Sequence, residues 1–112
     1  MRLVIIASLI GIASLAVASG CSKTLSASQK RGQAYYSLNC YECHEENQPD
    51  LIKAPPKLHN IFSHHYLADG TTAATDQSVR EVIISGKRTM PAFNGRLSSD
   101  QIDDIIAYLH SK

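Results

Sequence analysis

The sequence predicts a small all-α domain, and three observations carry that prediction. Apolar residues recur at i, i+3 and i+4 spacing around residues 79–83 and 102–109, which places them on one face of a helix. No segment alternates apolar and polar residues as a half-buried strand would, and no internal repeat is present. The Cys-x-x-Cys-His segment at residues 40–44 fits a helical turn, because its reactive side chains then share one face.

The first helix is expected over residues 29–38, with Ser26 or Ser28 as its N-cap. Gly32 lies inside this helix at a cost of about 1 kcal/mol relative to alanine, so we expect it to permit close packing against another helix. Residues 45–57 contain three prolines and are expected to form a loop with at most a short helical turn.

The middle of the chain is predicted to hold little regular structure before the second long helix. Residues 58–66 allow one or two helical turns, and the Asp-Gly pair at 69–70 indicates a chain turn. The next helix should start at Thr75 or Asp76, where a short polar side chain can cap it. It should stop at Gly86, because glycine is the usual residue just past a helix.

The last helix follows a loop at residues 87–95, which Pro91 breaks. Ser98 or Ser99 is its expected N-cap, and the acidic residues of its first turns lie near the positive end of the helix dipole. Its predicted buried face consists of Ile102, Ile105, Ile106 and Leu109.

Residues 1–20 are predicted to be an export signal, since Arg2 precedes a short apolar stretch that ends in small residues. Cleavage after Ala18 would fit an ordinary signal peptidase and release a soluble chain. Residues 18–21 instead resemble a bacterial lipoprotein box, in which Cys21 receives a lipid. We favour lipidation of Cys21, because a lone exported cysteine would otherwise be a free thiol. An uncleaved membrane anchor ranks second.

The chain is therefore divided into a signal peptide at 1–20, a polar tether at 21–28 and one domain at 29–112. Either cleavage places the domain outside the cytoplasm, in the periplasm, anchored or soluble. Removal of the signal leaves ten basic and ten acidic residues, which argues against nucleic-acid binding and polybasic membrane binding. We expect a monomeric domain that needs a bound group to complete its marginal core.

Cys40, Cys43 and His44 match the motif to which haem is covalently attached. Both thiols would add to haem vinyl groups, and the imidazole would supply the proximal nitrogen. A redox disulfide would need a strand and helix of thioredoxin type, and no β-branched run precedes Cys40. A structural zinc site would need four N or S ligands, while the remaining cysteine, Cys21, lies outside the domain.

An electron carrier also needs a second axial ligand, and Met90 is the only methionine left once the signal is removed. Its loop lies between two predicted helices, where a thioether could reach over a porphyrin. The alternative is that Met90 fills a gap in the core. His59, His64 or His65 could replace it and give a bis-histidine iron, although exposed loop positions are the favoured interpretation. His110 is expected to be exposed at a helix C-terminus.

From residue 29 to the C-terminus, the chain resembles the class I cytochromes c, in their compact bacterial monohaem form. Pro56 and Leu58 match the Pro-x-Leu segment of that family, whose proline carbonyl accepts the proton on the second nitrogen of the proximal imidazole. Such a bond would fix the tautomer and orientation of His44. The resemblance implies one covalent haem c, held between His44 and Met90.

The two terminal helices carry further matches to that family. Gly32 and Tyr36 resemble the Gly-x-x-x-aromatic pattern of its first helix, and Ile105 and Tyr108 resemble the paired positions of its last helix. The resemblance implies that these helices cross, with Gly32 allowing the close approach and Tyr36 packing on Tyr108.

The resemblance implies a one-electron carrier between a protein donor and a protein acceptor outside the cytoplasm, with no bond-making catalysis. The alternatives are a haem-based gas sensor, a peroxide-reacting haem protein with a displaceable Met90, and a dedicated cytochrome subunit of a dehydrogenase complex. Glu42, Glu45 and Glu46 surround the haem motif. The basic loop residues would ring the exposed haem edge and steer an acidic partner; they are Lys53, Lys57, Lys87 and Arg88.

Overall fold

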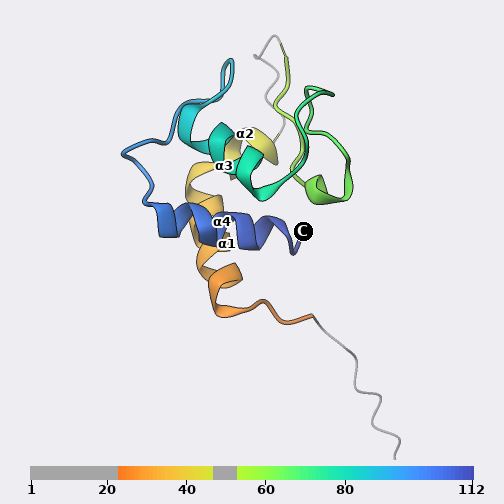
Figure 1. The fold of residues 1–112 in the computed structure, drawn as a ribbon. Helices are drawn as coiled ribbons and strands as arrows, with labels where there is room; N and C mark the ends of the chain where they lie inside the picture. Colours follow the sequence, from red (N-terminus) through yellow and green to blue (C-terminus); the bar gives the residue numbers. More distant parts are fainter. Residues whose placement is uncertain (1–22, 47–52) are drawn as a thin grey trace, which may run out of the picture.

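The computed structural model describes residues 23–46 and 53–112, and in them the chain is all-α, as predicted. Within these ranges, β-type pairing is limited to isolated bridges between single residues, which do not form strands. Figure 1 shows the helices gathered around one centre. They are α1 (Ala27–Asn39), α2 (Tyr41–His44), the 3-10 helix η1 (Ile61–Ser63), α3 (Asp76–Ser85) and α4 (Ser99–Leu109). The predicted export signal and Cys21 lie outside the described residues, as do residues 47–52 of the predicted loop.

The helices begin where short polar side chains satisfy their free N–H groups. Ser26 and Ser98 each form a capping box with the glutamine three residues later, and Thr75 accepts a hydrogen bond from the third N–H of α3. Because Ser26 is the cap, α1 starts at Ala27, and the end of the segment predicted as a tether is helical. Gly86 ends α3 with φ of 71°, as its position predicted.

Helices α1 and α4 cross at Gly32, as expected. A Cβ atom there would lie 1.8 Å from the carbonyl oxygen of Asp104, so only glycine allows this approach. Tyr36 packs edge-on against Tyr108, with ring centroids 5.3 Å apart. Arg31 donates two hydrogen bonds, of 2.7 and 2.8 Å, to the Asp104 carboxylate. In Figure 1 the blue α4 lies across the orange α1.

The core lies between this crossing and α3. Its buried apolar side chains come from three helices and the loop after α3; they are Tyr36, Val79, Ile83, Phe93, Ile102, Ile105, Ile106 and Leu109. The predicted apolar face of the last helix is therefore confirmed. Across residues 23–46 and 53–112, the helices are all too short or too polar to span a bilayer.

Candidate functional site

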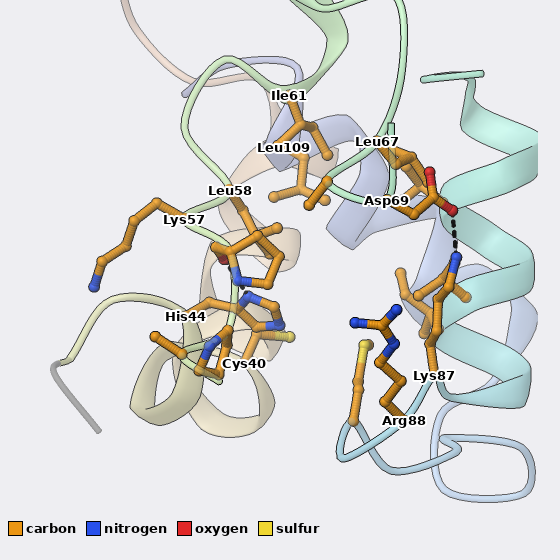
Figure 2. Close-up of a pocket in the computed structure, with 18 of the residues that line it drawn as sticks. Cys40, His44, Lys57, Leu58, Ile61, Leu67, Asp69, Lys87, Arg88 and Leu109 are labelled. Atoms are coloured by element: carbon orange, nitrogen blue, oxygen red, sulfur yellow. Dashed lines mark hydrogen bonds and ion pairs between the residues drawn. The ribbon is translucent and has the colours of Figure 1, made fainter. Parts of the chain in front are cut away.

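A cavity of about 920 Å³ opens beside the core, between α2 and the loop that follows α3. This volume is within the range of small-molecule and cofactor sites. Figure 2 shows Cys40 and His44 on one side of it and Lys87 and Arg88 on the other. The apolar part of its lining includes Leu58, Ile61, Leu67, Val79, Val82, Ile83 and Leu109.

The His44 imidazole is held in the cavity wall by burial and one hydrogen bond. The side chain is on α2, and the residue is only 7% exposed. Its Nδ1 lies 2.7 Å from the carbonyl oxygen of Pro56. Because a carbonyl can only accept, Nδ1 must carry a proton, so in the neutral imidazole the lone pair is on Nε2. A neutral imidazole whose Nδ1–H is held by a carbonyl is the form in which histidine binds metals through Nε2.

The two cysteines of the motif differ in their surroundings. Cys40 is half-buried and lines the cavity, whereas Cys43 is exposed. Burial raises the pKa of the Cys40 thiol to about 11, and the nearby Cys43 adds to the rise. A thioredoxin-like dithiol would follow a strand, whereas Cys40 directly follows helix α1, which disfavours that alternative.

Met90 lines the same cavity from the loop between α3 and α4. Its backbone N–H donates to the Lys87 carbonyl at 3.0 Å, and the Lys87 N–H donates to the Met90 carbonyl at 3.1 Å. These two bonds close a tight turn, which we call the Met90 turn (residues 87–90). Gly86 packs under it, because a Cβ there would lie 2.6 Å from the Met90 carbonyl oxygen. Met90 is half-buried, lines the cavity and packs against the core.

The remaining histidines are exposed, as expected. His64 lines the cavity, so it alone among the three alternatives to Met90 that the sequence offered lies in its wall. His110 is exposed at the C-terminal end of α4, as expected, and it also makes two contacts that the sequence did not indicate. Its Nε2 lies 2.7 Å from an Asp76 carboxylate oxygen, and its ring stacks on Phe62 with centroids 3.9 Å apart. The sequence could not reveal these contacts, because they join α4 to distant segments.

The predicted basic residues do gather at the cavity, since Lys53, Lys57, Lys87 and Arg88 all line it. The Lys57 ammonium donates to the Glu45 carbonyl oxygen at 2.6 Å, which joins the segment after Pro56 to the end of α2.

Glu45 is tied to the crossing of the terminal helices. Its carboxylate accepts a hydrogen bond from the Tyr36 hydroxyl at 2.6 Å and pairs with the Lys112 ammonium. These two donors, Lys112 first, hold the pKa of Glu45 below its usual value. Burial, followed by the bond to Glu45, raises the pKa of Tyr36, so its hydroxyl stays a donor.

Sequence reasoning marked Asp69 only as part of a turn and missed its place in the site. The Asp69 carboxylate lines the cavity and pairs with Lys87, as the dashed line in Figure 2 marks. The available signal was the Asp-Gly pair, which favours a turn in which the aspartate accepts nearby backbone N–H groups. Nothing local in the sequence points to Lys87 as the partner.

These residues fit a covalently held haem. The cavity combines an apolar lining, one half-buried thiol, an imidazole held through its Nδ1 and a thioether. Soft sulfur and imidazole nitrogen are the ligand types that haem iron takes from proteins. No group of three or more His, Cys, Asp or Glu side chains suited to a metal ion occurs within residues 23–46 and 53–112.

Comparison with known proteins also points to a haem-binding cytochrome. Residues 27–109 match the family model described as cytochrome C oxidase, cbb3-type, subunit III. A cytochrome c6 of Nostoc sp. is 34% identical over 93% of this chain and 87% of that protein. A cytochrome c6 of Limnospira maxima is 33% identical over 70% of this chain and 85% of that protein. The cytochrome c6 structure of the diatom Phaeodactylum tricornutum superposes with a TM-score of 0.56 at 28% identity, covering 74% and 91% of the chains.

Proposed function

This chain belongs to the class I monohaem cytochrome c family, and on that basis we propose that His44 and Met90 are the axial ligands of its haem. The protein is a cytochrome c6-like electron carrier with one covalent haem c, not an enzyme. The observation that best supports the ligand assignment is the convergence of Cys40, His44 and Met90 on one cavity.

The haem supplies the one-electron couple, and the residues of the chain hold it in a fixed setting. Cys40 and Cys43 would hold it through thioethers, each S–H adding across one vinyl double bond. Pro56 keeps the His44 imidazole in one tautomer and one orientation. Leu58 and the other apolar wall residues exclude water, which together with a sulfur ligand raises the reduction potential.

A rigid setting for both axial ligands suits rapid electron transfer, because little has to move when the charge changes. The Met90 turn is closed by two backbone hydrogen bonds, and the imidazole of His44 is buried and bonded. A sensor or a peroxide-reacting protein would instead need a sixth position that opens. The reciprocal bonds of the turn favour the carrier.

Redox titration of the haem-loaded protein tests the ligand assignment. Met90→His replaces the thioether by an imidazole and is expected to lower the reduction potential, because a His/Met pair holds it higher. Asn94→His adds the same side chain at an exposed loop position outside the cavity wall and should leave the potential unchanged. Equal potentials for wild type and Met90→His would rule out Met90 as ligand.

The basic residues of the cavity wall support an acidic protein partner. Lys53, Lys57 and Arg88 are exposed, so their charges face solvent beside the cavity. The expected consequence is that electron transfer to a partner slows as ionic strength rises, since salt screens charges beyond about 10 Å at 0.1 M. A triple Lys53→Gln, Lys57→Gln and Arg88→Gln variant should lose this salt dependence. Flat rates in the wild type would exclude steering.

We further propose that the protein works outside the cytoplasm, in the periplasm, anchored through a lipid on Cys21. A lipid would confine diffusion to the membrane surface and raise the effective concentration near membrane-bound partners. Cleavage after Ala18 remains the competing route. Mass spectrometry of the mature N-terminus separates them, because only lipidation adds acyl mass to a chain that starts at Cys21.

A second candidate function is a dedicated cytochrome subunit of an enzyme complex. The description of the matched family model, an oxidase subunit, favours it. Two large side chains, one just before the haem motif and one within it, are also exposed, Leu38 by 82% and Tyr41 by 46%, and would suit a lasting contact. Gel filtration of native membranes solubilised in mild detergent distinguishes the two. A free shuttle elutes alone, and a subunit elutes with its complex.

A further inference from the structure

We propose that the Asp69–Lys87 ion pair is a latch that holds the Met90 turn against the cavity, which makes both residues positioning residues for the sixth ligand. The pair joins two chain segments that are separate in sequence, the turn before α3 and the loop after it. This inference rests on the proposed function, because it requires Met90 to be the ligand.

Asp69 is held in place before Lys87 meets it. Its Oδ1 accepts the backbone N–H groups of Thr71 at 2.9 Å and Thr72 at 2.8 Å. Its Oδ2 accepts the Thr72 hydroxyl at 2.5 Å and the Lys87 ammonium. The side chain is only 16% exposed, and these donors, Lys87 first, hold the pKa of Asp69 well below its usual range. The carboxylate is therefore a fixed, charged anchor.

Lys87 passes this constraint to Met90 through the backbone. The two residues exchange both of their backbone hydrogen bonds, at 3.0 and 3.1 Å, so the position of Lys87 constrains that of Met90. Between them, Arg88 has φ of 57°, a left-handed conformation that non-glycine residues seldom adopt. A turn with a residue in this conformation needs contacts that keep it closed.

The base of the loop is fixed independently of Asp69. The Gly86 N–H donates to the Val82 carbonyl at 2.8 Å, and the Phe93 N–H donates to the Ile83 carbonyl at 2.9 Å. Phe93 is 5% exposed within the core. Both ends of the loop are thus bound to α3, while the bond that Lys87 donates to Asp69 lies at the start of the Met90 turn. Breaking the ion pair should loosen the turn without unfolding the domain.

The test is the rate at which carbon monoxide binds to the reduced, haem-loaded protein, because carbon monoxide can enter only when the sixth ligand leaves. Asp69→Asn keeps an acceptor for Thr71 and Thr72 but removes the charge that faces Lys87. Lys87→Gln removes the other charge, and the double variant completes a double-mutant cycle. Asp103→Asn is the matched control, since it breaks the Arg80 pair between α3 and α4.

We expect each single variant to bind carbon monoxide about three to five times faster than wild type, as loss of one ion pair would allow. The double variant should be no faster than either single variant, because the pair can be broken only once. Asp103→Asn should match wild type. Thermal unfolding of the same samples should show little change for Asp69→Asn, which separates positioning of the turn from general stability.

Rates equal to wild type in both single variants would overturn the latch, and so would additive effects in the double variant. Met90→Ala separates this result from failure of the proposed function. If Met90→Ala binds carbon monoxide rapidly while Asp69→Asn matches wild type, only the latch is wrong. If Met90→Ala leaves spectrum and rate unchanged, Met90 is not the ligand, and both proposals fall.

Discussion

Gly32→Ala should destabilise the protein by forcing the terminal helices apart. The new Cβ would lie 1.8 Å from the carbonyl oxygen of Asp104 and 2.4 Å from its carbonyl carbon. Cβ contacts below 3.0 Å essentially never occur, so α1 and α4 must separate by at least 1.2 Å, the difference between 1.8 and 3.0 Å. The new Cβ is fixed by the backbone of α1 and the carbonyl by the backbone of α4, so no side-chain rotation can relieve the clash.

The magnitude follows from two opposing contributions. Overpacking costs about 3 kcal/mol when the backbone itself must move. Alanine favours the helix by about 1 kcal/mol over glycine. We therefore expect the free energy of unfolding to fall by about 2 kcal/mol. Tyr36 and Ile105, each 1% exposed beside the crossing, would lose packing as the helices part.

The assay is equilibrium unfolding of the haem-loaded protein in guanidinium chloride, followed by far-UV circular dichroism. Ala34→Gly is the control, because Ala34 is exposed on the same helix and reports the propensity difference alone, a loss of about 1 kcal/mol. A Gly32→Ala protein as stable as wild type, or more stable, would refute the close crossing.

Three further outcomes are expected. The pKa of Glu45 is lowered beside Lys112, so its carboxylate stabilises the fold above the usual value of 4.5, and this contribution is lost as pH falls through the lowered pKa. Glu45→Gln should therefore make the free energy of unfolding less dependent on pH on the acid side of a pH titration. Gly86→Ala should cost about 2 kcal/mol in chemical denaturation, because φ is 71° and the Cβ would meet the Met90 carbonyl. Ser98→Ala should lower the unfolding free energy by about 1 kcal/mol through loss of its capping box, and an unchanged denaturation midpoint would contradict this.

The helices could be predicted from the sequence because their signals are local. Ser26, Thr75 and Ser98 cap the helices that follow them, and Gly86 ends α3, as short-range patterns indicated. Close helix packing at Gly32 was expected from its place inside a helix, but the last helix was identified as its partner only through resemblance to a family.

The site was predictable only in part, because much of it depends on contacts between distant segments. The motif and the resemblance pointed to His44 and Pro56, which the structure joins by a hydrogen bond. The Asp69–Lys87 pair was not foreseen, since residue charge does not reveal which distant partner a turn will meet. The contact of the exposed His110 with Asp76 was likewise not foreseen, because it depends on how α4 and α3 pack.

The most direct test of the His44 and Met90 assignment is the visible spectrum of the reduced, haem-loaded protein before and after exposure to carbon monoxide. An unchanged spectrum is predicted over minutes, because the Met90 turn keeps the sixth position filled. An immediate and complete spectral shift would show an open iron site, contradict the electron-carrier mechanism and favour gas sensing or peroxide chemistry.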